Sequence, residues 1–95
     1  MNKKSEIIAA MKELNLALNK YHKNTQIAQY VQETINEFQA SEAVDFIGDY
    51  TYFLTKASML KRSEGIEFNE VEQELWRKVR SFKEVSYKLF PGIGF

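Results

Sequence analysis

The sequence predicts an all-α protein, an antiparallel four-helix bundle followed by a short apolar C-terminal tail. Three observations support this fold class. Four segments carry apolar residues at the three- and four-residue spacing of a helix face, and none carries the sustained alternation of a strand. Short connections separate these segments, which favours antiparallel neighbours. Helix-capping residues stand at several of the predicted boundaries.

Length and composition limit the classes of function. The 95 residues have room for one domain, which we place at residues 1–95. The 13 basic and 13 acidic residues cancel, so no net charge attracts nucleic acid. The absence of cysteine excludes disulfides and thiolate chemistry and fits a reducing cytosol. No apolar run approaches the ~20 residues that span a bilayer, and the N-terminus lacks the pattern of an export signal. We expect a monomeric cytoplasmic protein, with peripheral contact at the inner face of the cell membrane as an open alternative.

The first two helices are expected over residues 5–20 and from residue 24 or 25 to residue 39. Ser5 is a suitable N-cap for the first of them. His22 falls in the polar connection between the two helices and is expected to be solvated. The apolar stripes that should face the core are Ile7, Met11, Leu14, Leu18 and Tyr21 in the first helix, and Ile27, Val31, Ile35 and Phe38, widened by Tyr30 and Thr34, in the second.

The third helix is expected over residues 42–62, after a very short turn near residues 40–41. Gly65 is placed as the left-handed residue that ends it. Tyr52 and Met59 fall on the side opposite the core at ~100° per residue, which indicates a second face, either buried or in contact with a partner. The broad inward face consists of Ala43, Phe46, Ile47, Tyr50, Phe53, Leu54, Ala57 and Leu60.

The fourth helix is expected to begin after Asn69, which caps it, with Glu72 three residues later as in a capping box. Acidic residues early in the helix and basic residues later complement the helix dipole. Pro91 should end the helix and release the apolar tail. The inward stripe is Val71, Leu75, Val79, Phe82, Ser86 and Leu89.

The residue types needed for catalysis or metal binding do not come together in this sequence. His22 is the single histidine, and Glu70, Glu72 and Glu74 alternate around a helix, so they do not converge on one ion. We therefore predict no catalytic residue, no metal site and no cofactor, and a protein that is not an enzyme.

One flank of the fourth helix carries Trp76, Arg80, Lys83 and Tyr87 at spacings of four, three and four. Aromatic and basic side chains in alternation are typical of a half-buried boundary, where the rings pack and the charges reach solvent. In one interpretation this flank is the shoulder of the bundle, with Trp76 covering the edge of the core. In the other it is a contact surface for a protein or a membrane interface.

The C-terminal tail has two interpretations of the same kind. Phe90, Ile93 and Phe95 are too apolar to extend freely into water without cost. The tail either folds back onto its own domain or docks on a partner. Together with the flank, these three residues form the predicted partner-binding site.

The segment from Tyr50 to Trp76 is similar to a known family. Tyr50-x-Tyr52-Phe53 and Phe68-x-Glu70 leading into Glu74-Leu75 resemble the pattern of the pediocin-like (class IIa) bacteriocin immunity proteins of the enterocin A immunity type. The resemblance extends over nearly the whole chain in length and helix order.

The resemblance implies an antiparallel four-helix bundle in the cytosol of a bacteriocin-producing cell. Such proteins act at the membrane receptor of the bacteriocin, the mannose phosphotransferase permease, and associate with it when bacteriocin is bound. In that family the C-terminal half governs which bacteriocin is resisted, which here places specificity on the fourth helix and the tail. The alternative function is a small regulatory or adaptor bundle that binds a soluble protein partner.

Overall fold

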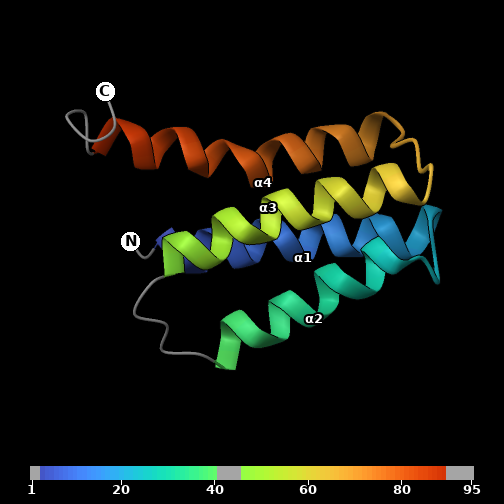
Figure 1. The fold of residues 1–95 in the computed structure, drawn as a ribbon, viewed down its shortest axis with the longest axis horizontal. Helices are drawn as coiled ribbons and strands as arrows, with labels where there is room; N and C mark the ends of the chain where they lie inside the picture. The colour runs from blue at the N-terminus through green and yellow to red at the C-terminus, as the bar shows by residue number, and fades with distance from the viewer. Residues whose placement is uncertain (1–2, 41–45, 90–95) are drawn as a thin grey trace.

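A computed structural model describes residues 3–40 and 46–89 of the chain, with side chains placed within 4–40 and 46–82. Four helices make up this part of the protein (Figure 1). They are α1 (Lys3–Tyr21), α2 (Gln26–Ala40), α3 (Phe46–Ser63) and α4 (Glu70–Leu89). The expected start of the third helix before Phe46, the turn near residues 40–41 and the tail lie outside the described residues.

The helices run alternately in opposite directions, as the fold prediction requires (Figure 1). α1 packs closely against both α2 and α4, and α2 packs against α3. α3 and α4 do not form a comparably close pair of backbones. The protein is therefore a compact all-α domain, consistent with a four-helix bundle, whose α3–α4 side is its most open side.

The apolar stripes of the first two helices form the centre of the core. In α1 the prediction is wrong at one residue, because the side chain of Tyr21 is exposed. Tyr21 is the last residue of α1, so no further turn of helix follows to cover its ring. The remaining stripe residues are buried as predicted, except that Tyr30 is half-buried: Ile7, Met11, Leu14 and Leu18 in α1, and Ile27, Val31, Thr34, Ile35 and Phe38 in α2.

α3 contributes Tyr50, Phe53, Leu54 and Ala57 to the core. Ile47, which was expected on this face, is exposed, since it lies at the edge of the stripe in the first turn of the described helix. Tyr52 and Met59 lie outside the inward face and are exposed, so the buried alternative for the second face is wrong, and its contact with a partner stays a prediction. Phe46 and Leu60 are partly buried against the core.

The inward face of α4 is rotated from its predicted position by about one residue. Val71, expected inside, is 50% exposed, whereas its neighbour Glu72 is fully buried. Trp76 and Val79 are also buried. Trp76 follows Glu72 by four residues and Val79 follows Trp76 by three, which is the spacing of one helix face. Leu75 and Phe82 only pack against the edge of the core. The prediction failed here because it excluded a carboxylate from the stripe, although burial of a charged group is tolerated when hydrogen bonds satisfy it.

The end of α3 and the start of α4 follow the predicted capping chemistry, whereas Ser5, predicted to cap the first helix, lies inside α1, which already begins at Lys3. Gly65 has φ +67°, and the amides of Gly65 and Ile66 donate to the carbonyls of Arg62 and Lys61 at 3.1 and 3.0 Å. This pair of bonds is the Schellman motif that a glycine at this position favours. At the start of α4, the Glu72 amide donates to Asn69 Oδ1 at 2.9 Å and the Asn69 amide donates to Glu72 Oε1 at 3.0 Å. The capping box is thus confirmed.

A second carboxylate caps α2 from a distant part of the sequence. Glu64, in the connection between α3 and α4, accepts hydrogen bonds from the amides of Gln26 and Ile27, both at 2.9 Å. The first amides of a helix have no partner within the helix and carry its positive dipole end, so a carboxylate is well suited to this position. This contact fixes the α3–α4 connection against the start of α2.

Within the residues that the structure describes, no helix combines the length and the apolar character that crossing a membrane requires.

Candidate functional site

Trp76, the first residue of the predicted contact flank, belongs to the core. Its side chain is only 8% exposed. The centroid of its ring lies 6.3 Å from that of Phe53 and 6.4 Å from that of Phe68, both in edge-to-face geometry. Aromatic pairs in this geometry stabilise a fold beyond the area that they bury. The assignment of Trp76 to a contact surface is therefore wrong, and the alternative, a ring that covers the core, describes it.

The remaining residues of the predicted site divide into two groups. Arg80 is exposed on α4, as the flank interpretation requires. The side chains of Lys83 and Tyr87 lie outside the described part of the chain, although both residues belong to the helix. Phe90, Ile93 and Phe95 also lie outside the described residues, so the fold-back of the tail and its docking on a partner both stay predictions.

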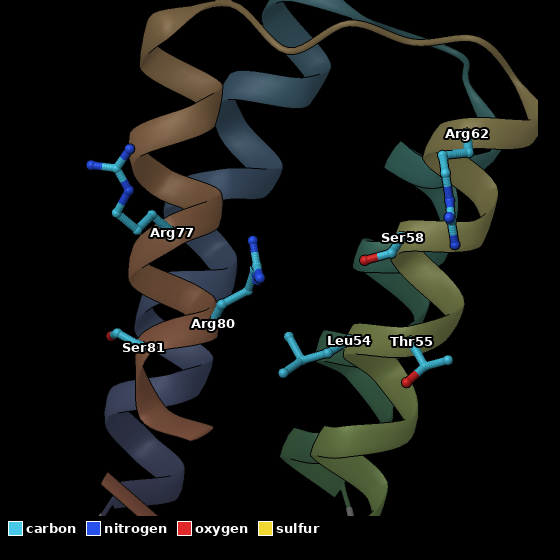
Figure 2. A pocket seen from close by; sticks show the side chains of 7 residues that line it. All are labelled: Leu54, Thr55, Ser58, Arg62, Arg77, Arg80 and Ser81. Atoms are coloured by element: carbon cyan, nitrogen blue, oxygen red, sulfur yellow. The ribbon is translucent and has the colours of Figure 1, made fainter. Parts of the chain in front are cut away.

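Arg80 lines a groove of about 630 Å³ between α3 and α4. Figure 2 shows that its side chain extends from α4 toward α3, while Leu54 and Ser58 extend from α3 toward α4. The side chain of Arg62 runs along α3 on the same side. The full lining consists of Leu54, Thr55, Ser58 and Arg62 from α3, and Arg77, Arg80 and Ser81 from α4.

The groove is strongly basic. Three arginines line it, and none of the acidic side chains that the structure describes does. Figure 2 shows that Arg77 extends away from α3, on the outer side of α4. There it forms an ion pair with Glu74 at 2.9 Å. Among the described residues, neither Arg62 nor Arg80 has an ion pair. The chain as a whole has no net charge, so this positive potential is local to the groove.

Among the described residues, a few large side chains join α3 to α4, and small side chains stand beside the arginines in the lining of the groove. The Tyr50 hydroxyl donates a hydrogen bond to the Val79 carbonyl, and the Phe53 ring contacts Trp76. Beyond these contacts, Ser58 extends from α3 toward α4 (Figure 2), and its short side chain does not fill the space between the two helices. The contacts of Tyr50 and Phe53 therefore set the spacing of α3 and α4, and the short side chain of Ser58 leaves part of the space between the two helices open.

A second polar cluster lies where the α1–α2 connection meets α4. The Nδ1 atom of His22 is 2.6 Å from Oε2 of the buried Glu72. The His22 side chain is 24% exposed and its ring lies 6.4 Å from that of Phe68. His22 was predicted to be solvated, and this prediction is wrong. Glu72 uses its other oxygen for the capping box, so one buried carboxylate joins α4 to the α1–α2 connection.

The contacts of His22 and Glu72 that the structure describes join parts of the fold to one another. A carboxylate that orients a histidine is also part of catalytic triads, where the histidine activates a nucleophile. Apart from Glu72, the side chain of His22 contacts the Phe68 ring, while its backbone carbonyl accepts from the Thr25 hydroxyl at 2.8 Å and its amide donates to the Leu18 carbonyl at 2.7 Å. The sequence contained one indication that Glu72 is buried, because Glu72 shares with Trp76 and Val79 the spacing of a single helix face.

Metal binding finds no support in the described part of the chain, where no three histidine, cysteine, aspartate or glutamate side chains gather closely enough to hold an ion.

Comparison of the chain with models of known protein families, with curated proteins and with solved structures found no match.

Proposed function

We propose that this chain is an immunity protein, which protects the cell that makes it from a pediocin-like bacteriocin by acting at the mannose phosphotransferase permease from the cytosolic side. The observation that carries the proposal is where the residues of the resemblance lie. Tyr50, Phe53 and Phe68 belong to the contacts that hold α3, α4 and their connection together. Three of the residues that carry the resemblance are thus ones on which this arrangement of helices depends, whereas Tyr52, Glu70 and Glu74, which also belong to it, are exposed.

The proposed contact surface is the exposed part of the α4 flank together with the tail. Arg80 represents it among the described side chains, and Lys83, Tyr87, Phe90, Ile93 and Phe95 complete the hypothesis. Trp76 is left out of the surface because it is buried. Its part in the proposal is to hold α4 against α3, which keeps Arg80 at the edge of the groove.

Resistance of a bacteriocin-sensitive strain tests the proposal directly. The strain expresses the chain in its cytosol and is exposed to a panel of pediocin-like peptides. We expect resistance to one or a few peptides, and its reduction by Arg80→Ser with little change in thermal stability, since exposed substitutions usually alter stability by no more than about 0.5 kcal/mol. Lys12→Ser is the matched control, because Lys12 is an exposed helical residue on α1, beside α2.

Two results would count against this proposal. If the unmodified chain protects against no peptide of the panel, the immunity function is wrong, and a regulatory or adaptor role with a soluble partner becomes the better explanation of the groove. If Arg80→Ser and Lys12→Ser reduce resistance equally, the assignment of the flank is wrong even though the function stands. The gene neighbourhood gives a further check, because a short adjacent gene for a secreted peptide with a double-glycine leader accompanies an immunity gene.

A further inference from the structure

The geometry of the groove between α3 and α4 points to a docking site for an acidic segment of a protein partner. This inference does not depend on the bacteriocin proposal, because it rests on the lining of the groove alone. The site consists of Arg62 and Arg80 as anion-binding groups, Ser58 as a hydrogen-bonding group between them, and Leu54 as the apolar floor.

The charges of the groove identify the chemistry of its occupant. A guanidinium group binds a carboxylate through two parallel hydrogen bonds, a geometry that a lysine does not offer. Arg62 and Arg80 come from different helices, and neither has an ion pair among the described residues. Because no carboxylate among the described side chains lines the groove, we expect both guanidinium groups to be available to carboxylates of another molecule.

The shape of the groove favours a peptide over a small anion or a lipid surface. At ~1.5 Å per residue, the stretch of α3 from Leu54 to Arg62 is roughly 12 Å long. An extended peptide covers this length with about four residues at ~3.3 Å each. A single phosphate would leave most of the 630 Å³ unfilled. A flat bilayer does not enter a groove between two helices. A protein without net charge also has little long-range attraction to an anionic bilayer surface. An acidic segment with interspersed apolar residues would pair its carboxylates with Arg62 and Arg80 and place an apolar side chain beside Leu54.

Direct binding of designed peptides tests the inference. The probes are two fluorescein-labelled peptides of about ten residues, one with glutamate and leucine in the alternation of an extended strand and one with both at helical spacing. Matched peptides carry glutamine in place of every glutamate. Fluorescence anisotropy measures binding, and amide chemical shifts locate it. We expect at least one glutamate peptide to bind and to shift the amides that flank Arg62 and Arg80, with affinity that falls as salt rises.

Variants of the groove separate this site from general charge attraction. Arg80→Ser and Arg62→Ser should each weaken binding about tenfold, and the double variant more than either single one. Arg80→Lys should retain part of the affinity, since it keeps the charge and loses the paired hydrogen bonds. Lys12→Ser removes the same charge from an exposed helical position on α1 and should leave binding unchanged. Circular dichroism melting of each variant confirms that it is folded.

Several outcomes would overturn the inference. They are the absence of binding by both glutamate peptides, equal binding of the glutamine peptides, equal weakening by Lys12→Ser, and shifts confined to α1 and α2. Inorganic phosphate and phosphatidylglycerol vesicles are the remaining probes. If the arginine variants abolish binding of either of these while no peptide binds, the groove is a phosphate or lipid site and the proposed occupant is wrong.

Discussion

Replacing Glu72 by alanine should lower the free energy of unfolding by about 3 kcal/mol, although this residue is a glutamate on a helix rich in exposed charges. The side chain is fully buried and both of its oxygens accept hydrogen bonds, Oε1 from the Asn69 amide at 3.0 Å and Oε2 from His22 Nδ1 at 2.6 Å. Alanine removes both acceptors and leaves a void where the carboxylate was.

The magnitude follows from these separate losses. Loss of a helix cap costs about 1 kcal/mol. A hydrogen bond to a charged group contributes about 1.5–3 kcal/mol, and the lower end applies to His22 because its side chain is partly exposed and water can replace the partner. The unfilled space adds a fraction of a kcal/mol. Glutamine at position 72 keeps the size and one acceptor, so Glu72→Gln should cost only about 1 kcal/mol.

Urea unfolding followed by circular dichroism and by the fluorescence of Trp76, the single tryptophan, measures these differences. For a chain of this length, a loss of 3 kcal/mol corresponds to a fall in melting temperature of roughly 15 °C. Glu70→Ala is the matched control, because Glu70 lies in the same first turn of α4 and is exposed. It should change stability by no more than about 0.5–1 kcal/mol.

A double-mutant cycle with His22→Ala measures the pair itself. We expect an interaction energy of about 1 kcal/mol or more between positions 22 and 72. If Glu72→Ala costs no more than Glu70→Ala, the carboxylate is not buried as the structure describes. If the two single effects simply add in the double variant, the hydrogen bond between His22 and Glu72 contributes nothing, and the argument for the rotated face of α4 loses its energetic basis.

Two further predictions concern contacts that join distant parts of the chain. Glu64→Ala should cost about 1 kcal/mol, because it leaves the amides of Gln26 and Ile27 without their acceptor; Glu67→Ala, an exposed control in the same connection, should cost less in the same urea titration. Tyr50→Phe should also cost about 1 kcal/mol, since it removes the hydrogen bond to the Val79 carbonyl and keeps the ring in place. An unchanged unfolding midpoint in Tyr50→Phe would show that this bond does not hold α3 to α4.

The sequence by itself determined the class of fold, the helices and most of their ends. These features depend on local physical chemistry, in which the spacing of apolar residues defines a helix face and the cap residues satisfy amides and carbonyls a few positions away. Gly65 and the Asn69–Glu72 capping box are at the predicted positions for this reason. The buried stripes of α1 and α2 were predictable in the same way, because apolar residues make up most of them.

Only the tertiary structure decided which residues of α4 face the core and which residues of its flank are buried or exposed. Hydrophobic periodicity predicts that Val71 rather than Glu72 is buried, but contacts with residues distant in sequence reverse this. His22 forms a hydrogen bond with the Glu72 carboxylate, and the rings of Phe53 and Phe68 pack against Trp76. The basic groove depends in turn on Arg62 and Arg80, which are remote in sequence and line the same groove because contacts between a few large side chains place α4 beside α3. A local pattern shows which residues share one helix face, whereas the partner that each face meets is set by packing between helices.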